Sequence, residues 1–65
     1  MNNLKKTMKI RSITQAELAR QLKVTKQCVN NWTRGINYPD YKNMKKVAEY
    51  LQVPIGKLFF EEDIK

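Results

Sequence analysis

The segment Thr14–Gly35 constrains the fold of this 65-residue chain more than any other part, because it carries the start signals of two short helices. Thr14 followed three residues later by Glu17 is a capping box. In such a box the threonine hydroxyl accepts from the third helical amide, and the glutamate carboxylate reaches back to the cap amide. A helix is therefore predicted to begin at Gln15 and to end near Lys23.

A second helix is predicted directly afterwards, from the cap residue Thr25 to about Arg34. Two short helices joined by a tight turn, here residues 15–34, are the signature of a helix-turn-helix. The two faces of the second helix differ in chemistry. At about 100° per residue, the inner face carries Thr25, Cys28, Val29 and Trp32, and the outer face carries Gln27, Asn30, Asn31 and Arg34, with Lys26 at its edge.

The outer face of this helix has the composition of a surface that reads DNA. Amide and cationic side chains form paired hydrogen bonds with adenine and guanine edges in a major groove. A surface helix that is only solvated more often pairs Glu with Lys, and no carboxylate occurs between residues 26 and 34. The second helix is therefore predicted to be a recognition helix.

Several stretches of the chain together match one known family: Ile13–Ala19, Leu22–Thr25, Val29–Gly35, and Leu51–Val53 with Leu58–Phe59 after it. Over residues 4–59 the sequence resembles the phage Cro/CI-repressor (Xre-type) DNA-binding domain. The resemblance implies an all-α fold, a compact five-helix bundle of the lambda-repressor-like DNA-binding type. The helix-turn-helix is made by its second and third helices, and residues 1–65 form a single domain.

The resemblance also implies which side chains contact double-stranded DNA. The base-reading positions fall on Gln15, Lys26, Gln27, Asn30 and Asn31, and the positions that contact the DNA backbone fall on Thr14, Thr25, Arg34, Asn37, Tyr38 and Lys42. Chemistry agrees with this division, since Gln and Asn suit adenine, Lys suits guanine, and amides at helix N-termini hold phosphates. Two alternatives stay open. Tyr38 could equally well pack at the rim of the hydrophobic core as contact the DNA backbone. The lysines of the first helix, Lys5, Lys6 and Lys9, fit a solvated face better than a DNA contact.

Four positions depart from the family pattern. Ser12 and Lys23 stand where the family usually has glycine at a helix end, and a left-handed backbone there costs up to about 1 kcal/mol at each position. Met8 and Thr33 stand where the family often pairs an arginine with a glutamate. Because both charges are absent together, no buried charge is left unpaired, and an apolar contact is predicted in place of the pair.

Amphipathic patterns predict three further helices. The first carries Leu4, Thr7, Met8 and Arg11 on one face, and Ile10 and Ile13 complete its packing side. The fourth spans Tyr41–Leu51 after the cap residue Asp40 and turns inward Met44, Val47, Ala48 and Leu51. The last has Pro54 in its first turn, where a missing amide costs nothing, and turns inward Ile55, Leu58 and Phe59.

Composition favours a polyanionic partner and excludes an enzyme. Thirteen Lys and Arg residues against six Asp and Glu residues give a net charge of +7. Half of the carboxylates, those of Glu61, Glu62 and Asp63, gather in the tail and are expected to lie away from the phosphates. Without His and with one Cys, the chain has no internal disulfide, too few ligands for a zinc site, and no nucleophile with a base. Cys28 is interpreted as a packing residue.

No apolar run approaches the roughly 18 residues of a membrane span, and the first residues lack the apolar stretch of a signal peptide. We therefore expect no membrane partner, and a cytoplasmic, nucleoid-associated protein encoded by a bacterium or a phage. No metal, cofactor or small-molecule ligand is expected.

These features indicate a sequence-specific transcriptional regulator, expected to be a repressor, that inserts residues 26–34 into the major groove of a near-palindromic operator. One such domain covers half a site, so we expect a homodimer, at least on DNA. The predicted dimer contact is a second apolar stripe on residues 54–65, formed at spacings of four by Gly56, Phe60 and Ile64. Alternatively, Phe60 folds over the edge of the core and the tail frays. The rival function is a protein-interaction module, an antirepressor or adaptor with the same fold, which the same stripe would serve.

Overall fold

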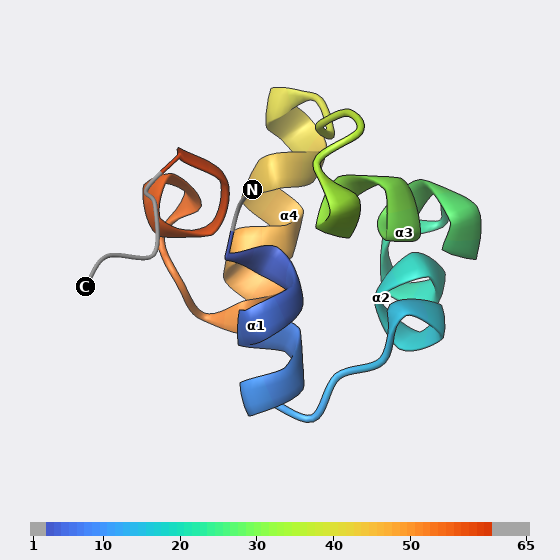
Figure 1. Cartoon of the computed structure of the whole chain (residues 1–65), viewed down its shortest axis with the longest axis horizontal. Coiled ribbons are helices and arrows are strands. Elements are labelled where there is room, and N and C mark those ends of the chain that lie inside the picture. Colours follow the sequence, from blue (N-terminus) through green and yellow to red (C-terminus); the bar gives the residue numbers. More distant parts are fainter. Residues whose placement is uncertain (1–2, 61–65) are drawn as a thin grey trace.

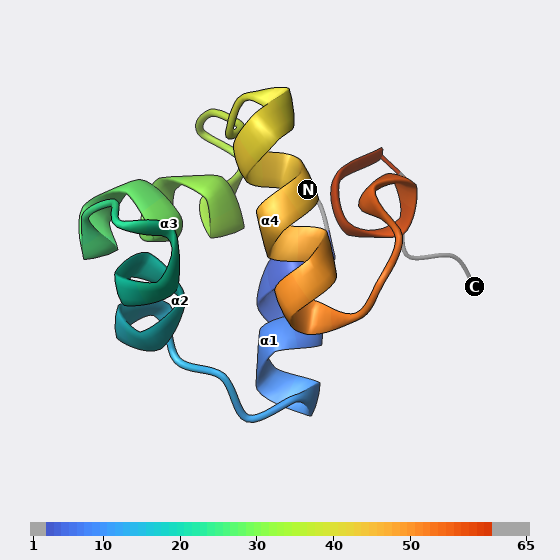
Figure 2. The ribbon, with the colours of Figure 1, turned by 180° about the vertical axis from the view of Figure 1, so that it is seen from behind.

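Four α-helices and a π-helical turn make up the fold in Figure 1, a computed structural model that describes residues 3–60. In chain order they are α1 (Leu4–Ile10), α2 (Gln15–Leu22), α3 (Lys26–Arg34), α4 (Tyr41–Leu51) and η1 (Gly56–Phe60). The pair α2 and α3 lies at one side and η1 at the other, with α1 and α4 between them, as Figure 2 shows from behind. The predicted helical bundle and its helix-turn-helix are confirmed. Across residues 3–60, none of these helices combines the length and the apolar character that crossing a membrane requires.

Side-chain caps fix the starts of α2, α3 and α4, as the sequence predicts. The hydroxyls of Thr14 and Thr25 each accept a backbone amide at 3.1 Å, and the Asp40 carboxylate accepts one at 2.8 Å. Each such cap contributes about 1 kcal/mol to stability. The Glu17 carboxylate, predicted to return to the cap amide, accepts instead from the hydroxyl of Tyr50 on α4. The capping box is therefore half formed, and its acidic member links two helices.

Left-handed residues follow the α-helices, and most of them are not glycine. Ser12 and Lys23 have φ of 59° and 60°, as predicted from the glycines that the family usually has there. Gln52 after α4 also has φ of 60°, and Gly35 after α3 has 76°. Gln52 thus adds a third strained position, not predicted from the sequence, at a cost of about 1 kcal/mol.

Each helix contributes one apolar face to the core. The side chains that are fully buried are Leu4, Leu18, Val29, Val47, Leu51 and Leu58, and those that are nearly so include Met8, Trp32 and Phe59. The inward faces predicted for α2 and α4 are therefore confirmed, and on α3 so are Cys28, Val29 and Trp32. Thr25, also predicted to face inward, is exposed because it stands before the helix as its cap, where its hydroxyl accepts an amide. Met8 and Thr33 are both buried, so two uncharged side chains occupy the positions where the family often has an ion pair.

Ile10 was predicted to complete the packing side of α1, and this prediction is wrong. The side chain is 72% exposed. Ile10 follows Met8 by two residues, about 200° further round the helix, so the face that buries Met8 turns Ile10 toward solvent. Ile13, by contrast, is half-buried and packs against the core as predicted.

Within the described residues, the last helix is a π-helical turn, which is wider than the regular helix that the sequence predicts. Its inward residues are buried or half-buried as predicted: Leu58, Phe59 and Ile55. Gly56 and Phe60, the start of the second apolar stripe, are exposed. Ile64, the third member of the stripe, lies outside the described residues.

Candidate nucleic-acid interface

The buried face of α3 fixes which of its side chains meet solvent. Val29 and Trp32 are 0% and 5% exposed and sit in the core. The exposed side chains of the helix are Lys26, Gln27 and Arg34, and the half-exposed ones include Asn30 and Asn31. Because the two core residues set the rotation of α3 about its axis, its amide and cationic groups are held outward together.

The start of α2 meets this outer face and forms with it a shallow open hollow of about 360 Å³, here called the reading hollow. It is lined by Gln15 from α2 and by Lys26, Gln27 and Asn30 from α3. Asn31 is joined to this group because Gln27 Nε2 donates to Asn31 Oδ1 at 2.9 Å. The structure therefore brings together, from two helices, the five side chains that the sequence predicts to read bases.

A buried threonine orients the Gln15 side chain against α3. Gln15 Nε2 donates to Thr33 Oγ1 at 3.5 Å, and the Thr33 hydroxyl donates to the backbone carbonyl of Asn30 at 2.7 Å. Thr33 is only 4% exposed, so both of its hydrogen bonds are formed within the protein. The sequence analysis assigned Thr33 an apolar contact and missed this role, for which the one available signal was a hydroxyl at a buried helical position.

The residues predicted to contact the DNA backbone are all exposed: Thr14, Thr25, Arg34, Asn37, Tyr38 and Lys42. Thr14 and Thr25 directly precede two residues of the reading hollow and cap their helices. The first amides of α2 and α3 therefore lie beside the hollow, where the positive ends of both helix dipoles favour an anion. The phosphate contacts of these residues stay predictions.

Tyr38 contacts the aromatic side chains of η1. Its ring meets Phe59 edge to face, with centroids 6.3 Å apart and an interplanar angle of 86°, and its centroid lies 6.4 Å from that of Phe60. The packing alternative for Tyr38 thus has identified partners, while 48% of the residue stays exposed. Phe60 is 65% exposed despite this contact, so it leaves most of its ring accessible to a partner.

A hydrogen bond joins α4 to α2, the helix that carries Gln15 of the reading hollow. The Tyr50 hydroxyl donates to Glu17 Oε2 at 2.5 Å, across 33 residues of sequence. This bond, together with burial and the charge of Glu17, raises the pKa of Tyr50, and the nearby charge of Arg20 opposes the shift. The neutral phenol is the form that the fold stabilises.

The reading hollow presents hydrogen-bonding and cationic side chains. Among the described residues, no three His, Cys, Asp or Glu side chains gather closely enough to hold a metal ion. Cys28 is a half-buried free thiol on the other side of α3, where it packs against the core as predicted. The hollow offers amide donors, amide acceptors and one ammonium group, which suit a polar and negatively charged surface.

Comparisons with known proteins agree with this geometry. A family model described as Helix-turn-helix matches residues 4–58. The HTH-type transcriptional activator BcrR of Enterococcus faecalis is 30% identical to this chain over 54 residues, which are 83% of this chain and 26% of that protein. The chain thus spans about a quarter of the length of the curated relative that it matches.

Proposed function

This chain belongs to the helix-turn-helix family, in its Cro/CI-repressor (Xre) type, and we propose that it regulates transcription by binding a specific sequence of double-stranded DNA. The observation that supports this most is the reading hollow, in which Gln15 of α2 joins Lys26, Gln27 and Asn30 of α3. Side chains of this kind, held outward by a buried opposite face, are what a major groove requires.

We propose that α3 enters the major groove with its N-terminal half. An α-helix with its side chains is about 10–12 Å across, and the groove is about 12 Å wide. The hydrogen bond from Gln27 to Asn31 leaves Gln27 Oε1 as an acceptor and Asn31 Nδ2 as a donor. An acceptor beside a donor matches the N6 and N7 edge of adenine, whereas Lys26 matches the O6 and N7 acceptors of guanine.

The DNA backbone is contacted on both sides of this helix in the proposed complex. Thr14 and Thr25 bring the free amides of two helix N-termini to one phosphate strand. Arg34, Asn37 and Lys42 follow at the C-terminal end of α3, in the loop after it, and at the start of α4. These exposed groups fix the register of α3, and the reading hollow supplies the sequence preference.

Binding by two copies is part of the proposal, because one domain covers half of a near-palindromic site. We propose that the copies meet through Gly56, Phe60 and Ile64. Two observations support an aromatic contact at this place: Phe60 is 65% exposed, and its ring lies beside that of Tyr38 in the loop after α3. A symmetric contact centred on this pair of rings would join the last turn and the loop in a single interface.

Repression is the direction of control that we propose, since a protein bound across a promoter excludes polymerase without any further contact. The relative from Enterococcus faecalis is named an activator. Transcription in vitro from the selected operator placed over a promoter measures the direction. Less transcript with added protein is expected, and more transcript would show activation instead.

The test of sequence-specific binding is selection of duplexes from a random pool, followed by salt titration on the selected and on mixed duplexes. Specific binding predicts an enriched near-palindrome and an affinity that falls steeply with salt on both duplexes. Failure to enrich any sequence, together with weak binding at low salt, would refute the proposal. It would favour the protein-interaction module, for which the exposed Tyr38 and Phe60 rings provide a surface.

A further inference from the structure

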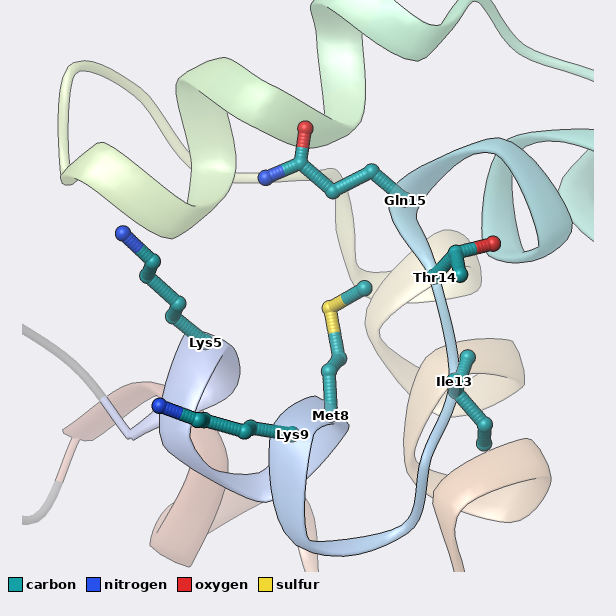
Figure 3. Close-up of a pocket in the computed structure, with 6 residues that line it drawn as sticks. All are labelled: Lys5, Met8, Lys9, Ile13, Thr14 and Gln15. Carbon is teal, nitrogen blue, oxygen red and sulfur yellow. The ribbon is translucent and has the colours of Figure 1, made fainter.

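A second hollow, of about 330 Å³, lies between α1 and the start of α2 and is here called the lysine hollow (Figure 3). Its lining residues are Lys5, Met8, Lys9, Ile13, Thr14 and Gln15. Figure 3 shows Lys5 and Lys9 leaving α1 toward the side of the hollow to which the Gln15 side chain also extends. Neither lysine has a place in the DNA contacts proposed so far.

The lysine hollow adjoins the reading hollow, because the Gln15 side chain lines both. The Gln15 side chain thus lies between two groups of residues: Lys26, Gln27 and Asn30 on α3, and the lysines of α1. A duplex bound on α3 as proposed above would therefore have the lysine hollow beside its base-reading contacts.

The charge in the lysine hollow is of one sign. Lys5 and Lys9 are four residues apart on one helix, a spacing at which like charges repel, and no carboxylate is among the lining residues. Glu17, the acidic residue of α2, is hydrogen-bonded to Tyr50 on α4. Met8 is 3% exposed and gives the lysine stems an apolar floor, while their ammonium groups stay in solvent. An anion between the two ammonium groups would remove their repulsion.

The structure also separates the three lysines of α1, which the sequence analysis treated as one solvated face. Lys5 and Lys9 line the hollow, and Lys6 does not. Lys5 and Lys9 are neighbours on the face of α1 that meets the start of α2, and Lys6 lies about 100° further round the helix.

We propose that the lysine hollow binds a backbone phosphate of the DNA at the edge of the half-site, held by Lys5 and Lys9. This inference rests on the proposed function and extends its contact surface to α1. The occupant is a DNA phosphate because the hollow is continuous with the base-reading surface and carries the charge that complements a phosphate. The contact is independent of sequence, so it adds affinity for every duplex.

The experiment uses the full chain with Lys5→Ala, Lys9→Ala and both together, and measures binding to the selected operator and to a mixed duplex over a range of salt concentrations. Each alanine should flatten the slope of log affinity against log salt by about one unit, and the double variant by about two. In 0.1 M salt this corresponds to a loss of roughly tenfold per lysine, equal on both duplexes. Lys5→Arg with Lys9→Arg should restore most of the slope, because the charge remains.

Lys46→Ala is the matched control. Lys46 is also an exposed helical lysine, but it lies beside Gln21 and Leu22 at the other end of α2, so its removal should leave the slope nearly unchanged. Phosphate ethylation interference adds a local measurement. One position at the edge of the half-site should interfere with binding of the parent, and lose that effect in the double variant.

Several results would overturn the inference. An equal flattening by Lys46→Ala would assign the effect to net charge, and a loss confined to the operator would make the lysines readers of bases. A double variant that keeps the full slope would refute the lysine hollow alone, while the proposed function stands. A parent that shows neither a steep slope nor a preferred sequence would refute the proposed function first, and the inference with it.

Discussion

Removal of either amide from the Gln27 and Asn31 pair should damage operator binding much more than folding. These two side chains are hydrogen-bonded to each other at 2.9 Å on the outer face of α3. A paired contact to one base is worth about 1–3 kcal/mol of discrimination, so Gln27→Ala or Asn31→Ala should weaken operator binding about 5- to 150-fold. An exposed pair at this helical spacing contributes only about 0.2–0.5 kcal/mol to stability, so the melting temperature should hardly move.

The hydrogen bond between the two side chains makes a stronger prediction about the double variant. If Gln27 Oε1 and Asn31 Nδ2 together contact one adenine, either single substitution removes the paired contact. The double variant should then cost about as much as the worse single variant, which is a coupling of about 1–3 kcal/mol between the two positions. Separate contacts to separate bases would instead give costs that add.

The assay is fluorescence anisotropy at fixed salt with the selected operator and with a mixed duplex, combined into a double-mutant cycle. Gln21→Ala, which removes an exposed amide at the far end of α2, is the matched control and should bind as the parent does. Affinity for the mixed duplex should be unchanged in all variants. Operator binding at the parent level by both single variants would show that α3 does not read the sequence, and additive costs would refute the shared base.

Trp32→Ala should cost about 3–5 kcal/mol, because the side chain is 5% exposed, and this is enough to unfold most of so small a domain. If Trp32→Ala melts cooperatively near the melting temperature of the parent, as monitored by circular dichroism, that result would contradict the burial of Trp32. Tyr50→Phe should lower the melting temperature at neutral pH, since the hydrogen bond to Glu17 raises the pKa of Tyr50 from its usual 10.0. That stabilisation is complete below pH 10 and is lost as the pH rises through the raised pKa of Tyr50. The difference in melting temperature between the parent and Tyr50→Phe should therefore disappear in strong alkali, and a difference that stays constant with pH would refute a role of the hydrogen bond between Tyr50 and Glu17 in stability. Phe60→Lys should abolish cooperative binding to two half-sites while single-site binding persists, whereas retained cooperativity would place the dimer contact elsewhere. Lys23→Gly should raise stability by up to about 1 kcal/mol because φ is 60° there, and a lower denaturation midpoint would show that the strain is compensated.

The features that the sequence could predict are the ones that depend on neighbouring residues. The caps at Thr14, Thr25 and Asp40 each depend on a side chain and an amide three residues away, and all three are formed. The left-handed turn at Lys23 was predicted differently, from the glycine that the family usually has at that position. Spacing along a single helix likewise separated the core face of α3 from its outer face.

The features that the sequence could not predict depend on contacts between distant segments. The hydrogen-bond partner of Glu17 is Tyr50, 33 residues away, and no local sequence pattern predicts that pair. The separation of Lys5 from Lys6 depends on how α1 lies against the start of α2. The π-helical form of η1 also departs from the local pattern, which at Gly56 and Phe60 favoured a regular helix. Grouping residues by face therefore succeeded along α2 and α4 but failed at Ile10 of α1, and grouping them into a site required the packed structure.

The hydrogen bonds around Thr33 limit how this protein could be retargeted by grafting. Exchanging the outward residues of α3 for those of another regulator leaves Val29 and Trp32, and hence the core, in place. Yet Gln15 stands on α2, and its amide donates to the hydroxyl of a threonine that is buried beneath the outer face of α3. Exchange of the whole of α3 is different, because a donor helix with another residue at position 33 would remove the hydroxyl that bonds to Gln15. We expect the base preference at Gln15 to change as well, although Gln15 lies outside the graft. We therefore expect specificity to transfer with residues 15–34 as one block, and a library that also varies position 33 to alter the contribution of Gln15.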